Sequence, residues 1–186
     1  FIETNDKKNI LSDPWYEGEI FNNGWRLIYK NKDKQIKDLL LKTKFIYLSH
    51  EHPDHFSVNF FYKYLKYLKQ NKIKILFQET SDKRLENFLK EKFDLKFQIL
   101  KNSFTKKSKK RILSLYKNNY IDSSLIYESK NFYHINFNDC NFQDYEINFI
   151  KKKLINKKKK KYYISNFLMQ HIDRMINGLK MLLYIS

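Results

Sequence analysis

Three of the chain's five histidines, His50, His52 and His55, fall within six residues, in the segment SHEHPDHF. An apolar run with no helix breaker precedes the segment and predicts a buried strand over residues 44–49. Aromatic residues and leucines at helical spacing follow it and predict an amphipathic helix with Ser57 as its N-cap. A short loop between a strand and a helix can direct several side chains at one point. The segment therefore favours an α/β arrangement with its imidazoles gathered at the end of a strand.

The same alternation of strands and helices runs through the first hundred residues. Further helices are predicted over residues 33–43 and after an N-cap at Ser81, and further strands over 25–30, 72–77 and 96–100. Three strands then follow one another, over residues 111–116, 123–128 and 132–137. Alternating elements followed by a run of strands predict an α/β chain with mixed sheets.

The composition of the 186 residues, with 42% hydrophobic and 17% aromatic residues, predicts one domain with a sizeable core rather than a disordered tail. No apolar run reaches the roughly 20 residues that span a bilayer, so we expect no membrane span. Cys140 is the only cysteine, which excludes an intrachain disulfide and suits a reducing compartment, so we expect a cytoplasmic protein. The chain begins with Phe1 and has no signal-peptide pattern, and it is expected to be a fragment.

The net charge of +17 suggests a nucleic-acid partner at first sight. However, alanine is absent, Val58 is the only valine, and lysine, asparagine and isoleucine are abundant, as expected from an AT-rich coding sequence. The lysines are also scattered, apart from a dense run over residues 151–161. We interpret that run as a solvated face, with an anion-binding patch as the alternative. No specific nucleic-acid partner is predicted.

The histidine segment has the composition of a metal site. His50 and His52 are two residues apart, so their side chains face the same way in an extended segment, and Asp54 and His55 follow at the turn into the helix. Neutral imidazoles and carboxylates are good ligands for zinc, iron and manganese. Incidental surface histidines are the alternative, but the crowding of the three favours a metal site.

This segment resembles the His-x-His-x-Asp-His motif of the metallo-β-lactamase superfamily. The segment DPWYEGEIFNNGW, which begins at Asp13, is similar to the opening of one branch of that superfamily. The branch holds ascorbate-phosphate-lactonase-like hydrolases, N-acyl-phosphatidylethanolamine phospholipase D enzymes and the hydrolase-like part of CMP-sialic acid hydroxylase. The segment from Asp122 to Cys140 looks like the strand–turn–strand that ends in the superfamily's metal-bridging aspartate, so the resemblance covers about residues 10–140.

The resemblance implies a four-layer αββα sandwich with mixed sheets. Residues 1–150 would form the metallo-β-lactamase-like domain, and residues 151–186 would be a Lys-rich segment and a tail that matches poorly. Because the part after Asp139 is short for this fold, we expect the sandwich to be incomplete at its C-terminal end.

The resemblance also implies a site for two divalent ions, zinc in the first instance, with iron or manganese as alternatives. His50 and His52 would bind the first ion, Asp54 and His55 the second, and Asp139 would bridge them. The ions would activate a water for attack on an ester, lactone or phosphodiester of a small-molecule substrate, and Asp54 would orient that water and move its proton.

Asp13 would orient one of the histidines, with an ordinary Asp-Pro turn as the equal alternative. Two ligands of the superfamily have no clear counterpart. The further histidine of the first ion has only Asn119 or Asp122 near its place, and the last ligand has only His171, which we interpret as a helix residue. His134 and Cys140 are interpreted as packing residues. The substrate-binding residues stay unknown, and the aromatic cluster of Trp15, Tyr16, Phe21 and Trp25 fits a substrate pocket or core packing equally well.

Two other functions stay open beside a hydrolase. The first is a catalytically impaired or non-catalytic remnant, because ligands are missing. The second is a portion of a nucleotide-sugar monooxygenase like CMP-sialic acid hydroxylase. Such an oxygenase needs a Rieske cluster with paired cysteine and histidine ligands, which a chain with one cysteine cannot supply.

Overall fold

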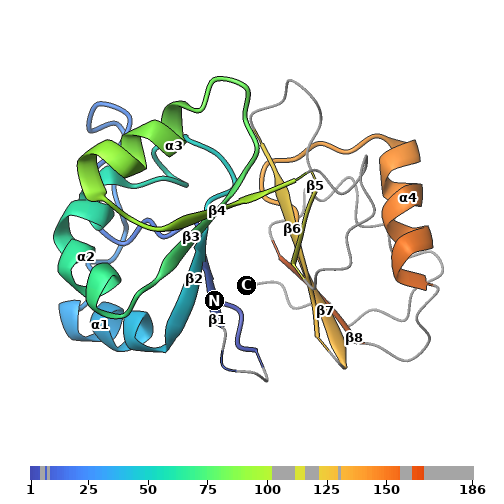
Figure 1. Ribbon diagram of the computed structural model, residues 1–186, viewed down its shortest axis with the longest axis horizontal. Helices are drawn as coiled ribbons and strands as arrows, with labels where there is room; N and C mark the ends of the chain where they lie inside the picture. Colours follow the sequence, from blue (N-terminus) through green and yellow to red (C-terminus); the bar gives the residue numbers. More distant parts are fainter. Residues whose placement is uncertain are drawn as a thin grey trace. The chain divides into compact units, whose positions relative to one another are not determined.

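The computed structural model describes residues 1–4, 7, 9–101, 112–115, 122–129, 131–155 and 161–165. The chain divides into two compact units, Phe1–Leu100 and Lys101–Ser186. Each unit holds one four-stranded sheet with helical structure beside it (Figure 1). Within the described part of the chain, no helix has the length and apolar character to cross a membrane. The predicted α/β class is confirmed.

The sheet of the first unit is parallel throughout, in the order β1-β2-β3-β4. Its strands are β1 (Asn9–Ser12), β2 (Thr43–Tyr47), β3 (Lys74–Gln78) and β4 (Phe97–Leu100). The connections carry α1 (Asp33–Lys42), α2 (Val58–Gln70) and α3 (Arg84–Phe88), which continues into a π-helical turn at Leu89–Phe93. These helices lie on one face of the sheet (Figure 1). Because all four strands run the same way, the loops that follow them meet at one edge.

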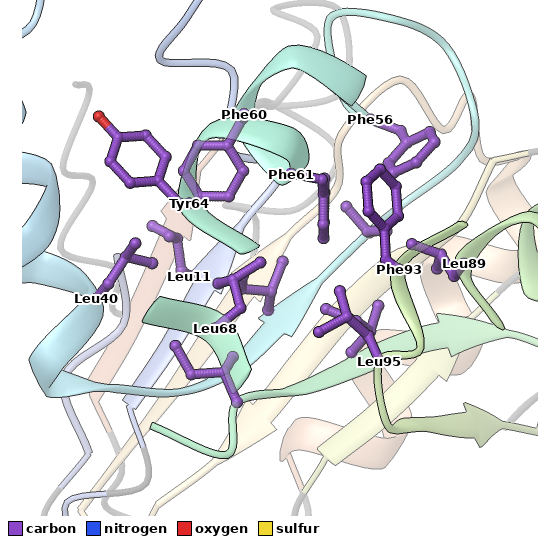
Figure 2. Packing of buried hydrophobic residues seen from close by; sticks show 14 of the residues in the cluster. Leu11, Leu40, Phe56, Phe60, Phe61, Tyr64, Leu68, Leu89, Phe93 and Leu95 are labelled. Atoms are coloured by element: carbon purple, nitrogen blue, oxygen red, sulfur yellow. The ribbon is translucent and has the colours of Figure 1, made fainter. Parts of the chain in front are cut away.

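The core of this unit lies between the helices and the sheet. Helix α2 buries an apolar stripe at helical spacing, formed by Phe60, Phe61, Tyr64 and Leu68. Figure 2 shows this stripe beside Leu11 and Leu40 on one side and beside Phe93 and Leu95 on the other. The stripe that the sequence predicts therefore holds α2 on the sheet. It also fixes the loop just before α2, residues 48–55, which holds His50, His52 and His55 and is called the histidine loop below.

The start of α2 is also as predicted. Ser57 is the N-cap, and its Oγ accepts a hydrogen bond from the Phe60 backbone N–H at 3.3 Å. The predicted cap at Ser81 is wrong, because α3 begins at Arg84, and Lys83 at its N-cap has a left-handed backbone and makes no side-chain cap. The carboxylate of Asp82 accepts from the Arg84 backbone N–H instead.

The predicted strand over residues 25–30 is also wrong. Trp25 pairs with Ile20 in an isolated bridge, and no strand follows it. Ile28 and Tyr29 are 91% and 83% exposed. The apolar side chains of this alternating segment are therefore not buried against another part of the described structure.

The second unit holds a mixed sheet in the order β5-β6-β7-β8, in which the last pair is parallel and the others antiparallel. Its strands are β5 (Ile112–Leu115), β6 (Ser124–Glu128), β7 (Phe132–Asn136) and β8 (Lys161–Ser165), with α4 (Asp144–Ile155) between the last two. Residues of β6, β7 and α4 form a second buried cluster, which includes Ile126, Ile135 and Ile150. The end of α4 and all of β8 fall in the segment that the sequence assigned to a poorly matching tail.

Gly18 lies in the loop that leads from β1 towards α1, and it has a left-handed φ of +78°. A Cβ at this position would lie 2.2 Å from Asn59 Nδ2 on α2. Gly18→Ala is therefore expected to lower the free energy of unfolding by about 1–2 kcal/mol, as measured by urea titration. Adding Asn59→Ala should restore only the part due to the clash, because the backbone strain remains. Equal stability of Gly18→Ala and the wild-type chain would contradict this expectation.

Candidate metal centre

The histidine loop begins where β2 ends. It lies at the edge of the parallel sheet that is formed by the C-terminal ends of the strands. The Ser49 backbone carbonyl accepts a hydrogen bond from Gln78 Nε2 of β3 at 3.3 Å, which holds the start of the loop against the neighbouring strand. The His52 carbonyl accepts from the backbone N–H groups of His55, at 3.0 Å, and Phe56, at 2.7 Å. This tight turn folds His55 back towards the start of the loop.

His50 and His52 bring two ring nitrogens together. His50 Nε2 lies 2.8 Å from His52 Nδ1, and the ring centroids are 4.4 Å apart. His50 is fully buried, whereas His52 is exposed. Two nitrogen ligands of a tetrahedral zinc, with bonds of about 2.0–2.1 Å, lie about 3.3 Å apart. A small outward movement of one ring would therefore give this pair the spacing of two ligands on one ion.

His55 and Asp54 form a second pair of ligand atoms. His55 Nε2 lies 3.4 Å from Asp54 Oδ2, and the two side chains are 12% and 23% exposed. Asp54 Oδ1 is buried and has no hydrogen-bond partner among the residues that the structure describes. A buried carboxylate oxygen without a partner costs about 1–3 kcal/mol or more, and a bound cation removes that cost. The donor set of the loop thus fits divalent metal ions.

Asp13 directly follows β1 and contacts this loop. Its Oδ1 accepts a hydrogen bond from the Ser49 backbone N–H at 2.7 Å, and its Oδ2 lies 3.4 Å from His55 Nδ1. Ser12 Oγ donates to the same Oδ2 at 3.1 Å. A carboxylate at Nδ1 favours the tautomer in which Nδ1 carries the proton and Nε2 is the ligand atom. Asp13 therefore lies where it can orient His55.

Ser49 is a residue of the site that our sequence reasoning missed. Its Oγ lies 3.0 Å from His50 Nδ1 and 3.1 Å from His55 Nδ1. A hydroxyl oxygen has two acceptor lone pairs, so it can accept from both rings when each Nδ1 carries the proton. In that state both Nε2 atoms are available as ligands. The sequence indicates this role only by the position of Ser49 next to the first histidine. The spacing of the residues does not predict the contact between Ser49 and His55.

Ser49→Ala is expected to weaken zinc affinity by about 10–100-fold, because both imidazoles lose a hydrogen bond that holds the ligand tautomer. Competition with a chromogenic chelator measures the affinity. Ser49→Thr keeps the hydroxyl and should retain most of it. Ser57→Ala is the matched control. The hydrogen bonds described for the Ser57 hydroxyl are with the Glu17 carbonyl and the Phe60 backbone N–H, and neither partner is a histidine. Unchanged affinity in Ser49→Ala would show that the hydroxyl does not position the rings.

Asp139 belongs to the second unit, where it lies in the turn after β7. The turn is closed by a hydrogen bond from the Cys140 backbone N–H to the Phe137 carbonyl at 3.1 Å. Asn138, with a left-handed φ of 49°, donates from its side chain to the Ser123 carbonyl. These contacts present the carboxylate of Asp139 at the tip of the turn, where it is exposed. Its part in the metal centre stays a prediction.

The other residues considered from the sequence have different surroundings. Burial lowers the pKa of His134, on β7, to about 4, so its ring is neutral at pH 7. Burial raises the pKa of the Cys140 thiol to about 12, and Cys140 packs against the second buried cluster, as its interpretation as a packing residue predicts. Asp122 is half-buried just before β6, whereas Asn119 and His171 lie outside the described residues.

The aromatic cluster before α1 divides between the two predicted roles. Tyr16 packs against the core, with its ring 6.0 Å from that of Phe60 in an edge contact. Trp15 is half-buried and donates from its indole N–H to the Gly18 carbonyl at 3.2 Å. Phe21 and Trp25 contact each other but are 44% and 56% exposed. Core packing is thus confirmed for Tyr16 and does not account for Phe21.

A search against protein-family models finds no match. Among solved structures, the chain is similar to a possible metal-dependent hydrolase from Veillonella parvula DSM 2008, with a TM-score of 0.59 and 15% identity over 97% of this chain and 79% of that one. It is also similar to the metallo-β-lactamase fold protein YhfI from Bacillus subtilis, with a TM-score of 0.44 and 12% identity over 79% of this chain and 76% of that one.

Among curated proteins, a stretch of 51 residues is 35% identical to cytidine monophosphate-N-acetylneuraminic acid hydroxylase of Danio rerio, and this match spans 27% of the chain but 8% of that relative. The likeness to the Veillonella structure extends over nearly the whole chain. The chain therefore has the fold of that structure.

Proposed function

We propose that the chain is a metal-dependent hydrolase that cleaves an ester, lactone or phosphodiester bond. The observation that carries the proposal is the histidine loop, in which His50 Nε2 and His52 Nδ1 lie together and His55 Nε2 lies beside Asp54 Oδ2. The Oδ1 atom of Asp54 is buried and has no hydrogen-bond partner among the described residues, so a bound cation would stabilise it. The solved structure with the same fold is described as a possible metal-dependent hydrolase, which agrees with this proposal.

In this proposal His50 and His52 would hold one ion, and Asp54 and His55 would hold a second. Asp139 would supply a further carboxylate to them, as the motif resemblance implies. Zinc is the first choice for both ions because imidazole nitrogen and carboxylate oxygen suit it, and iron or manganese are the alternatives.

When bound, the ions supply a water that is deprotonated near neutral pH. The residues of the chain do the rest. Ser49 and Asp13 hold protons on the Nδ1 atoms, so that His50 and His55 present Nε2. Asp54 lies at the edge of the cluster, where its carboxylate can accept a hydrogen bond from the nucleophilic water and carry its proton. The histidines would bind metal as neutral imidazoles.

The test is metal content together with hydrolysis. We expect about two ions of zinc, iron or manganese per purified chain by elemental mass spectrometry, and cleavage of at least one member of a panel of aryl esters, lactones and aryl phosphodiesters. Removal of the ions by a chelator should abolish cleavage, and zinc should restore it. A metal content well below one ion per chain, even after zinc is added, would contradict the proposal and favour the non-catalytic remnant.

One observation favours a second candidate. The 51-residue match to cytidine monophosphate-N-acetylneuraminic acid hydroxylase agrees with a portion of a nucleotide-sugar monooxygenase. The chain has one cysteine, so it cannot itself hold the cysteine pair of a Rieske cluster. Under this alternative the chain would bind a cytidine nucleotide sugar without hydrolysing it, which isothermal titration with CMP-sialic acid distinguishes from hydrolysis.

A further inference from the structure

A pocket of about 700 Å³ opens beside the histidine loop, entirely within the first unit. His52 and Pro53 of that loop form one wall, and Phe21 and its neighbours in the loop before α1 form another. Phe56, Val58, Leu85 and Phe88 add further apolar side chains to the lining. The volume falls within the range of about 300–1,000 Å³ that is typical of small-molecule sites. Because His52 belongs to both, the pocket adjoins the metal centre.

Part of the pocket lining is formed by apolar side chains that are also buried in the core. Phe56 and Leu85 are 6% and 4% exposed, and the rings of Phe56 and Phe88 meet edge to face with centroids 5.9 Å apart. The wall that carries Phe21 is closed by reciprocal backbone hydrogen bonds between Ile20 and Trp25, at 3.0 and 3.2 Å. Such a lining gains free energy by covering apolar groups of a ligand.

The one positive charge of the described pocket lining is already paired. Arg84 is the one lysine or arginine among its described lining residues. Its Nη2 lies 2.6 Å from Glu51 Oε1, and its Nε lies 2.6 Å from Asp82 Oδ2. With two carboxylates around this guanidinium, and with Glu19 also in the lining, the rim offers no net positive charge to an anionic ligand. The charges therefore disfavour an anionic group in the pocket, and the apolar side chains of the lining favour an uncharged apolar one.

We propose that this pocket binds a neutral apolar group of the substrate, such as an acyl chain or an aryl ring, while the bond to be cut lies at the His52 side. The substrate class is thus an ester, lactone or phosphodiester with an apolar substituent. The identity of the cut bond rests on the proposed function, whereas the binding of an apolar group by the pocket does not.

The pocket is tested first by itself, with the neutral fluorescent probe N-phenyl-1-naphthylamine. We expect saturable binding to the wild-type chain, weakened about fivefold or more in Phe21→Asp, which puts a charge into the apolar wall. Phe21 is 44% exposed and has a left-handed φ of 50°, a backbone that aspartate adopts more readily than phenylalanine, so the variant should fold. Tyr29→Asp is the matched control, because Tyr29 is 83% exposed and does not line the pocket.

The link to the metal centre is tested with alkyl hydroxamates, which bind metal through their head group. Octanohydroxamate should displace the probe from the zinc-loaded chain at a concentration at least about tenfold lower than acetohydroxamate, because its chain can fill the pocket. Phe21→Asp should remove most of this advantage, and Tyr29→Asp should keep it.

Equal probe binding by the wild-type chain and Phe21→Asp, or equal potency of the two hydroxamates, would overturn the pocket proposal. If the binding pattern holds but no ester, lactone or phosphodiester is cleaved, the hydrolase proposal fails and the pocket stands. If cleavage occurs without the binding pattern, the pocket proposal fails and the hydrolase stands.

Discussion

His52→Ala is expected to keep the fold and to lose at least about 100-fold in zinc affinity at the first position. Its imidazole is exposed, so its removal leaves no large cavity in the core. The pair supplies two imidazole nitrogens, His50 Nε2 and His52 Nδ1. Without His52, the first ion would keep only the His50 nitrogen of this pair. Circular dichroism checks the fold, and chelator competition measures the affinity.

The matched control for this variant is His134→Gln. His134 is on β7 and outside the histidine loop, and a neutral polar side chain replaces a ring that is neutral at pH 7. Metal content should be unchanged in the control. Equal metal content in His52→Ala and the wild-type chain would show that His52 is not a ligand. His50 is a poorer choice for this experiment, since it is fully buried and its removal would also change packing.

Phe61→Ala is expected to lower the free energy of unfolding by about 3–5 kcal/mol, because the side chain is fully buried at the centre of the stripe on α2. Its ring contacts those of Phe56, Phe60 and Phe93, with centroids 5.1, 5.5 and 5.7 Å away. The cavity left by alanine would therefore have aromatic walls that cannot collapse easily (Figure 2). Urea titration followed by circular dichroism gives the free energy.

The neighbouring Tyr62→Ala provides the comparison for this second variant. Tyr62 is 57% exposed, and its ring contacts that of Phe93, with centroids 4.8 Å apart. We expect it to cost at most about 1 kcal/mol. A similar loss in the two variants would mean that the buried stripe does not hold α2 on the sheet. Because Phe56 directly follows the histidine loop, Phe61→Ala should also weaken zinc binding.

The features that the sequence predicted correctly are those whose signal is local. The stripe of α2 and the cap at Ser57 depend on residues three or four positions apart, and both are as predicted. The strand predicted over residues 25–30 failed because alternation predicts a strand only where a neighbouring strand is present to pair with it. The cap at Ser81 failed because the Asp82 carboxylate, one residue later, takes the hydrogen bond at the start of α3.

In the candidate site, too, the local features could be predicted from the sequence and the long-range contacts could not. The histidines and Asp54 share one short segment, so their common chemistry is visible in the sequence. The contact of Asp13 with Ser49 spans 36 residues, and it exists because β1 and β2 are parallel neighbours. The two contacts of the Ser49 hydroxyl depend on the turn that folds His55 back, which no spacing rule predicts. The pocket likewise needs three separate segments to be brought together.

The bond from the Ser49 backbone to the Asp13 carboxylate joins the histidine loop to the end of β1, which is an edge strand of its sheet. Within the described residues, β1 pairs with a full strand on one side, and an isolated bridge joins its Ile10 to Ile2. Detachment of β1 would directly disturb the histidine loop, because Asp13 follows this strand. A ligand that binds the ordered loop more tightly than the disordered one must, by thermodynamic linkage, also favour the attached state of β1. Metal binding at the histidines, as proposed, would thus be coupled to retention of the first strand.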